Sequence, residues 1–336
     1  MTGDAVTDRG VWFRVDDGGT GSAARRAAER LAGQLGFDEA RTADLSIVVA
    51  ELTSNLVKHA QDGMLLLRPV RAEQEAGVEL VAIDSGPGMA DVTDSARDGH
   101  STTGTLGIGL GAIVRQASWF DAYSRPGRGT VIAVRVWPGQ DPGRAWVDGL
   151  TRPLTGETVS GDGCAWRIVD GRRQVLVSDG LGHGPLAAAA TDAALAAFRV
   201  APAAPPTEVV AHLHRSMAHT RGAALAVAEP DPETGLLRYA GLGNITGALL
   251  TSDGRRGLVS LPGIAGHQRP VIRGYEYPFD AGSLLVMHSD GVVDRWRLDD
   301  YPGLAERSPL VVAATVLRDA GTRRDDAGVL VARAWS

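Results

Sequence analysis

The chain is divided near its middle by a cluster of proline and glycine residues, Pro138-Gly-Gln-Asp-Pro-Gly143. These residues interrupt helices and strands, and no apolar periodicity crosses the cluster. With 336 residues, the chain is too long for one typical hydrophobic core and suits two domains. We therefore expect a first domain at residues 1–138, a linker at 139–150 and a second domain at 151–336.

Composition and charge narrow the classes of function. The net charge is −6, and no basic stripe interleaved with aromatic residues occurs, which argues against nucleic-acid binding. The single cysteine, Cys164, excludes an intrachain disulfide and is expected in the core rather than as a nucleophile. No apolar run reaches the ~20 residues that span a bilayer, and the N-terminus lacks the features of a signal peptide. We expect a cytoplasmic protein without a membrane partner.

The first half alternates helical and strand patterns. Apolar spacing predicts helices over residues 22–35 and 38–59, and strands are predicted at 11–15, 64–70, 78–83, 120–124 and 130–136. Residues 89–104 are predicted to form a long polar loop, a length typical of either a functional lid or a disordered segment. This order indicates an α/β domain.

The second predicted helix carries Glu51 and Asn55 four residues apart, so both side chains lie on one face. A separate apolar stripe on the same helix consists of Leu45, Val48, Val49, Leu52 and Leu56. Such a polar pair alone is more often a solvated face than a site. Lys58 and His59 likewise fit either a solvated helix end or contacts to phosphate.

Two glycine-rich motifs change that balance. Asp84-x-Gly86-x-Gly88 ends a predicted strand, and Gly107-x-Gly109-x-Gly111 opens a predicted helix. Backbone N–H groups at a helix N-terminus bind phosphates, and an amide oxygen can help to hold Mg²⁺. A carboxylate such as Glu51 can accept a proton from an attacking hydroxyl group. Together the three motifs favour a nucleotide site.

At these residues the sequence resembles the GHKL ATPase superfamily, over residues 20–137. Together with Asp98-Gly-His-Ser-Thr, the motifs are most similar to RsbT-type serine/threonine kinases and less so to RsbW-type anti-sigma-factor kinases. The resemblance implies a Bergerat α/β sandwich. In it, Glu51 would be the general base, Asn55 a Mg²⁺ ligand, and Asp84 the residue that accepts a hydrogen bond from the adenine amine. It also implies a pocket for ATP shaped by the glycines of both motifs and flanked by Thr130 and Arg115. Lys58 replaces the aspartate of gyrase and MutL relatives, and no phospho-accepting histidine helix precedes the motifs, which disfavours a histidine kinase.

The sequence pattern of the second half predicts many short strands and two or three helices. Asp170-Gly171 predicts a two-residue hairpin turn, and Pro185 suits the first turn of a helix that runs to about Phe198. Acidic residues recur beside glycine at strand edges: Asp162, Asp179, Asp290, and the pair Asp325 and Asp326. Carboxylates that converge from distant segments repel each other unless hard divalent cations neutralise them. Two Mg²⁺ or Mn²⁺ ions could also activate the water that attacks a phosphomonoester.

This order resembles PP2C-type phosphatases of the SpoIIE and RsbX branch, over residues 151–334. The resemblance implies a β-sandwich flanked by helices, in an α+β domain, with a dimetal site between the sheets. The implied metal ligands are Asp162, Asp179, the Gly180 carbonyl, Asp290 and Asp325, with Asp326 as an alternative to Asp325. His183 is either a proton donor or a loop histidine near the metals.

The two resemblances imply opposite reactions on one chain. We expect a bifunctional switch protein that uses Mg-ATP to phosphorylate, and a dimetal site to dephosphorylate, a serine or threonine of a regulatory protein. The families imply a STAS-domain anti-sigma-factor antagonist or a stressosome-type protein as substrate, with an anti-sigma or sigma factor as a further partner. As an alternative, the ATP-binding domain binds a partner or regulates the phosphatase without transferring phosphate.

Overall fold

Aspartate side chains cap the two long helices near the N-terminus. In the computed structural model, which describes residues 5–6, 10–72, 75–92, 109–143, 145–267 and 270–334, Asp17 and Asp38 each accept a hydrogen bond from a backbone N–H of the first turn, at 2.8 and 2.7 Å. Such caps satisfy amides that lack a partner within the helix. Because Asp17 supplies this cap, the first helix begins at Gly18, before the start at residue 22 that the apolar pattern predicts.

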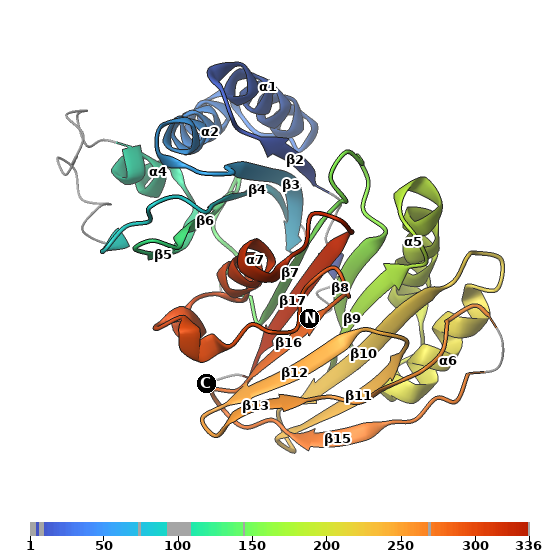
Figure 1. The fold of residues 1–336 in the computed structure, drawn as a ribbon. Coiled ribbons are helices and arrows are strands. Elements are labelled where there is room, and N and C mark those ends of the chain that lie inside the picture. Colours follow the sequence, from blue (N-terminus) through green and yellow to red (C-terminus); the bar gives the residue numbers. More distant parts are fainter. Residues whose placement is uncertain are drawn as a thin grey trace. The chain divides into compact units, whose positions relative to one another are not determined.

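The chain divides into two units, residues 8–144 and residues 145–336, the latter joined by the first seven residues. The first unit is an antiparallel sheet in the order β2-β3-β4-β6-β5 with helices on one face (Figure 1). Its elements are β2 (Val11–Arg14), α1 (Gly18–Gln34), α2 (Glu39–His59), β3 (Met64–Ala72), β4 (Glu75–Asp84), α4 (Gly109–Gln116), β5 (Trp119–Arg125) and β6 (Gly129–Val136).

The core of this unit lies between the sheet and the helices. The apolar stripe predicted on α2 is buried there, since Leu45, Val48, Val49 and Leu52 are all 0% exposed. Val78, Leu80 and Ala82 of β4 face the same core, as period-two alternation requires. The face of α2 away from this stripe is therefore left for Glu51 and Asn55.

A buried ion triad joins three strands of the first sheet. Arg68 on β3 contacts Oε1 of Glu79 on β4 through Nε at 2.6 Å and Nη2 at 2.5 Å. Arg135 on β6 contacts Oε2 of the same carboxylate through Nε at 2.8 Å and Nη2 at 2.7 Å. Burial alone would raise the pKa of Glu79, but the two guanidinium groups lower it below its ordinary value. The charged form of Glu79 is therefore stabilised by folding.

We expect Glu79→Gln to destabilise the first unit by about 3–5 kcal/mol, because it leaves two buried guanidinium groups without a counter-charge. Hydrogen exchange of β3, β4 and β6 in urea measures this, with Glu75→Gln at the exposed end of the same strand as the control. Because folding lowers the Glu79 pKa, its contribution is complete above the ordinary value of 4.5 and is lost as pH falls below it. Equal acid sensitivity in wild type and Glu79→Gln would contradict this assignment.

The second unit is a sandwich of two sheets flanked by helices (Figure 1). One sheet has the order β1-β8-β9-β10-β11-β14, with β15 also paired to β11, and the other has the order β13-β12-β16-β17-β7. The strands are β1 (Ala5–Val6), β7 (Val147–Arg152), β8 (Asp162–Val169), β9 (Arg172–Gly180), β10 (Ala223–Asp231), β11 (Leu236–Leu242), β12 (Thr246–Thr251), β13 (Gly254–Gly257), β14 (Ser260–Leu261), β15 (Tyr275–Pro278), β16 (Leu284–His288) and β17 (Ala327–Arg333). The helices are α5 (Gly184–Val200), α6 (Pro206–Ser216) and α7 (Pro309–Ala320), with short 3₁₀ turns at Leu298–Asp300 and Leu304–Glu306.

Two sequence predictions for this unit are confirmed. Asp170 and Gly171 both have positive φ, 47° and 76°, and join β8 to β9 as a two-residue hairpin turn. Cys164 is fully buried in the core between the sheets. Strand β7, by contrast, starts at Val147, so part of the range expected to be linker is a strand paired with β17.

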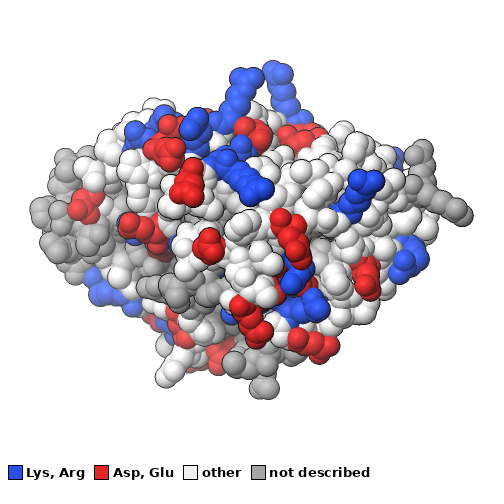
Figure 2. All heavy atoms as spheres, turned by 90° about the horizontal axis from the view of Figure 1, so that it is seen from below, with Lys and Arg blue, Asp and Glu red and all other residues white. Residues whose placement is uncertain are grey.

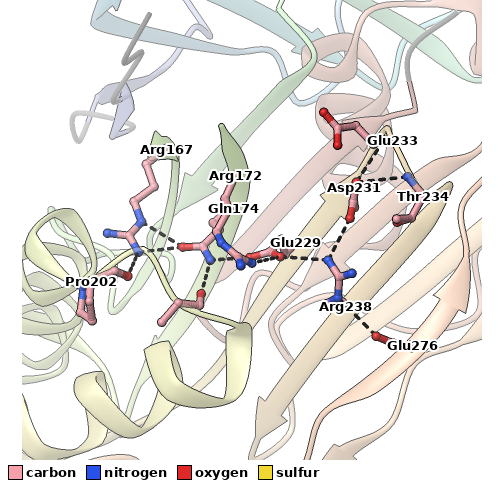
Figure 3. Close-up of polar contacts among 11 residues, drawn as sticks. Arg167, Arg172, Gln174, Pro202, Glu229, Asp231, Glu233, Thr234, Arg238 and Glu276 are labelled. Atoms are coloured by element: carbon pink, nitrogen blue, oxygen red, sulfur yellow. Dashed lines mark hydrogen bonds and ion pairs between the residues drawn. The ribbon is translucent and has the colours of Figure 1, made fainter. Parts of the chain in front are cut away.

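A polar network fixes the connector after α5 to the first sheet of the sandwich (Figure 3). The guanidinium of Arg167 donates to the carbonyls of Ala201 and Pro202, at 2.5 and 3.0 Å, and to Gln174 Oε1. Gln174 Nε2 in turn donates to Glu229 Oε2 at 2.6 Å. Since these groups are buried, each bond satisfies a polar atom that would otherwise be costly. The network therefore defines where α5 ends.

Acidic and basic side chains intermingle on the face of the molecule drawn in Figure 2. That face gives no support for a broad basic surface of the kind that binds nucleic acid nonspecifically. Among the helices described, none is both long enough and apolar enough to cross a membrane.

Candidate functional sites in the two units

The first predicted site lies where α2 meets the N-terminus of α4. A Cβ atom placed on Gly109 would lie 3.1 Å from Glu51 Oε2 and 3.5 Å from Asn55 Oδ1. Glu51 and Asn55 are partly exposed on the same face of α2. The structure thus brings the second glycine motif to the carboxylate and amide, although they are more than fifty residues apart in sequence.

The end of β4 meets the end of the same helix. A Cβ on Gly86 would lie 2.5 Å from the carbonyl oxygen of His59, and Ser85 N donates to Gln61 O at 2.9 Å. Asp84 Oδ1 accepts the backbone N–H of Gly86 at 2.7 Å, which orients this carboxylate at the strand end. The β4 end that carries Asp84 therefore packs against the C-terminal end of α2, the helix that carries Glu51 and Asn55.

Of the remaining predicted pocket residues, Thr130 and Gly88 lie close to the end of β4. Thr130 is the cross-strand partner of Asp84, and its Oγ1 lies 2.9 Å from Ser124 Oγ. Gly88 requires glycine, because φ is +68° and a Cβ would lie 2.1 Å from the Arg125 carbonyl oxygen. Gly111 is buried within α4. Gly107 and the Asp98-Gly-His-Ser-Thr motif lie outside the described residues, while Lys58, His59 and Arg115 are exposed at helix ends.

The second predicted site lies at one end of the sandwich, where both sheets contribute carboxylates. Asp162 at the start of β8 is the register partner of Asp179 near the end of β9. Asp290 follows β16 and Asp325 precedes β17, and these two strands pair along their length. The fold therefore brings together acidic residues that the sequence spreads over more than 160 positions.

Asp162 is the most buried of these carboxylates. Its Oδ2 accepts a hydrogen bond from Ser289 Oγ at 2.5 Å, whereas its buried Oδ1 has no partner among the described residues. Burial raises the pKa of Asp162 well above its ordinary value, and the nearby Asp179 carboxylate raises it further. An orphaned buried carboxylate oxygen of this kind suits a cation.

The neighbouring carboxylates behave in the same way. Burial, followed by the charges of Asp290 and Asp325, raises the pKa of Asp179 to about 7. Burial and then Asp325 also raise the pKa of Asp290. Hard divalent cations would relieve this repulsion, and oxygen donors are the ligands they prefer. Within the described residues, no group of three or more histidine, cysteine, aspartate or glutamate side chains is already arranged to hold a metal ion.

Asp325 and Asp326 have different surroundings. The Asp326 carboxylate accepts the backbone N–H groups of Leu154 and Gly161, at 2.7 and 2.8 Å, and is therefore occupied by the protein itself. The charge of Asp325 acts on Asp179 and Asp290, whereas the charge of Asp326 acts on Asp162, so both acidic residues lie near the site and differ chiefly in these backbone contacts. These contacts favour Asp325 as the candidate ligand and a structural role for Asp326, which stays a prediction.

This assignment predicts different defects for the two asparagine variants. Asp325→Asn should weaken Mn²⁺ binding by about tenfold to a hundredfold or more. The stability of the metal-free protein should change little. Asp326→Asn should destabilise the fold by roughly 1–3 kcal/mol, since it weakens two buried hydrogen bonds to backbone amides. Calorimetric Mn²⁺ titration and urea unfolding in EDTA separate the two effects. The opposite pattern would exchange the two roles.

Gly180 is the last residue of β9, and His183 lies on the short loop between β9 and α5. Gly180 packs so closely on α5 that a Cβ would lie 2.2 Å from the Ala187 carbonyl oxygen, and its N–H donates to Gly161 O at 3.0 Å. His183 is the N-cap residue of α5, with its side chain 60% exposed and Nδ1 3.2 Å from Glu157 Oε1. Its proposed role as a proton donor stays a prediction.

Three residues at this site were not predicted from the sequence. Ser289 Oγ donates to Asp162 and accepts the N–H of Gly328 at 3.0 Å, and Asn244 Nδ2 donates to Asp290 Oδ2 at 2.6 Å. Glu157 is the partner of His183. Ser289 could have been suspected from its place in Ser-Asp-Gly, whereas the contacts of Asn244 and Glu157 are identified only by the fold.

Comparisons with known proteins agree with this division. A histidine kinase-like ATPase domain family matches residues 13–136, and the family of Stage II sporulation protein E (SpoIIE) matches residues 169–335. Serine/threonine-protein kinase RsbT of Bacillus subtilis (strain 168) is 33% identical over 115 residues, which are 34% of this chain and 86% of RsbT. A solved chain described under "The bacterial stressosome: a modular system that has been adapted to control secondary messenger signaling" is 31% identical. That match covers 56% of this chain and 98% of the solved one, with a TM-score of 0.52.

Fold and sites therefore define a GHKL-type ATPase domain joined to a PP2C-type phosphatase domain. Through its first unit the chain belongs to the RsbT family of serine/threonine kinases, here fused to a SpoIIE-type phosphatase.

Proposed function

We propose that this chain is a bifunctional switch protein that both adds phosphate to and removes it from a serine or threonine of a regulatory protein. The observation that carries the proposal is that one chain groups the residues for both reactions. Glu51, Asn55 and Gly109 adjoin in one unit, and the carboxylates around Asp179 gather in the other.

In the first unit, the proposed substrate is Mg-ATP. Asn55 would help to hold the magnesium ion, and Asp84, oriented by the Gly86 N–H, would accept the adenine amine. The start of α4 would bind phosphate oxygens with N–H groups of its first turn, which have no partner within a helix. Glu51 would then accept the proton of the attacking serine or threonine hydroxyl.

In the second unit, Asp162, Asp179, Asp290, Asp325 and the Gly180 carbonyl would hold two Mg²⁺ or Mn²⁺ ions. When bound, the ions would supply positive charge for the phosphoryl oxygens and activate water. Ser289 orients Asp162, and Asn244 orients Asp290. His183, held by Glu157, would donate a proton to the leaving serine or threonine oxygen.

For the substrate, we propose a STAS-domain anti-sigma-factor antagonist or another stressosome-type protein. The relation to RsbT and the similarity to a chain from a bacterial stressosome study support this class of partner. Two opposing activities on one chain act at a high effective concentration on the same bound partner.

Incubation of the full chain with Mg-ATP and a candidate STAS protein tests the proposal by mass spectrometry. We expect one serine or threonine to gain phosphate, and to lose it after ATP is removed and Mn²⁺ is added. Removal of phosphate without any transfer from ATP would favour the alternative, in which the ATP-binding domain binds a sigma factor or regulates the phosphatase. Absence of both reactions with every STAS protein tried would overturn the proposed function.

A further inference from the structure

Arg221 lies beside the loop that leads from Asp179 and Gly180 at the end of β9 to His183. Strand β10 pairs with β9 so that Ala224 is opposite Asp179 and Ala223 is opposite Gly180. The pairing continues beyond the strands, because Leu181 N donates to the carbonyl of Gly222 at 3.1 Å. Arg221, the residue before Gly222, therefore lies next to Gly182.

The side chain follows the backbone to this position. Arg221 Nη1 lies 3.5 Å from where a Cβ atom on Gly182 would be, and the residue is exposed. Gly182 has a φ of +87°, so the loop turns there, between Gly180 and His183. Within the described part of the chain, Arg221 has no ion-pair partner. Its guanidinium group is therefore near the site without being neutralised by a carboxylate.

A phosphomonoester is a dianion at neutral pH, whereas this end of the sandwich contributes mainly carboxylates. Metal ions would offset part of that negative charge, but the outer phosphate oxygens would still need donors. A guanidinium group suits them, because its planar N–H donors form paired hydrogen bonds with phosphate. Arg221 is a described cation that adjoins the loop and lacks a carboxylate partner.

We propose that Arg221 binds the phosphate oxygens of the substrate during dephosphorylation, as a substrate-binding residue rather than a metal ligand. This inference rests on the phosphatase half of the proposed function. It assigns recognition of the phosphoryl group to the turn before β10, outside the acidic motifs.

Kinetics with p-nitrophenyl phosphate and binding of inorganic phosphate, both with Mn²⁺ present, test the proposal. For Arg221→Ala we expect KM and the dissociation constant of phosphate, measured by calorimetry, to rise about tenfold to a hundredfold. The Mn²⁺ concentration for half-maximal activity should stay unchanged. Arg221→Lys should restore part of the phosphate affinity, because it keeps the charge but loses the paired donors. Arg215→Ala, at an exposed position in the last turn of α6, is the matched control.

The proposal is overturned if Arg221→Ala keeps KM and phosphate affinity within twofold of the Arg215→Ala control. It is also overturned if the variant changes the Mn²⁺ requirement instead, since that would indicate a structural effect on the metal site. Failure of the wild-type chain to hydrolyse any phosphomonoester would count against the phosphatase function itself. Calorimetry with phosphate would still test Arg221 in that case.

Discussion

Asp179→Asn is expected to reduce phosphatase activity by at least about a hundredfold while phosphate transfer from ATP is retained. Disruption of groups that merely support metal ligands already costs about 10–100-fold in affinity or activity, so loss of a ligand should cost at least as much. The negative charges of Asp290 and Asp325 both act on Asp179. Asp179 is also opposite Asp162 in the β8–β9 register. A neutral amide there removes one of the negative charges that would bind the ions.

A second measurement separates this role from simple misfolding. Because burial and like charges raise the pKa of Asp179, its ionised form is disfavoured in the metal-free fold. Asp179→Asn should therefore stabilise the protein in EDTA and remove the stabilisation that Mn²⁺ gives to wild type. Asp170→Asn is the matched control, since it makes the same change at the exposed turn of the same hairpin, where asparagine tolerates positive φ. Phosphatase activity equal to that of this control would contradict a metal-binding role.

Much of the fold follows from local patterns. Apolar spacing at Leu45, Val48 and Leu52 predicts α2 and its buried face, because a helix at a domain surface repeats its core positions every three or four residues. The turn at Asp170-Gly171 is predicted because both residues tolerate positive φ. In such segments the sequence neighbours alone determine the structure.

Other elements depend on tertiary contacts that a local pattern does not contain. In α7, every residue from Pro309 to Leu317 is buried, so this helix has no polar face to produce an amphipathic period. Strand β7 contains Asp148 and Gly149, which interrupt an apolar alternation, and it forms through pairing with β17. Neither element is predicted by periodicity.

The site shows the same division. The acidic residues are visible in the sequence because each lies at a strand edge, and Asp162, Asp179 and Asp290 also adjoin glycine. Their different roles are not visible: Asp325 and Asp326 are adjacent, yet only Asp326 is held by two backbone amides. Asn244 reaches Asp290 only because of where the turn before β12 lies in the folded domain. Residue type thus indicates the chemistry, and the fold determines which contacts each residue makes.

Glu51→Gln is expected to reduce phosphate transfer from ATP by about 10²–10⁴-fold, the usual contribution of a general base. Glutamine keeps the shape and the contact with the start of α4, where Glu51 Oε2 lies 3.1 Å from the Cβ position of Gly109, but it no longer accepts a proton. ATP affinity should therefore change little, and phosphatase activity should be unaffected. Single-turnover transfer to a STAS protein and equilibrium binding of ATP measure the two effects.

Two companion variants make this prediction specific to Glu51. Asn55→Ala should weaken binding of Mg-ATP itself, because it removes an oxygen that would help to hold the ion, whereas Glu51→Gln should spare binding. Glu39→Gln, an exposed change in the first turn of the same helix, should spare both. If Glu51→Gln loses ATP affinity as Asn55→Ala does, Glu51 organises the pocket rather than accepting a proton. If transfer continues at the wild-type rate, another group on this face of α2 or α4 is the base.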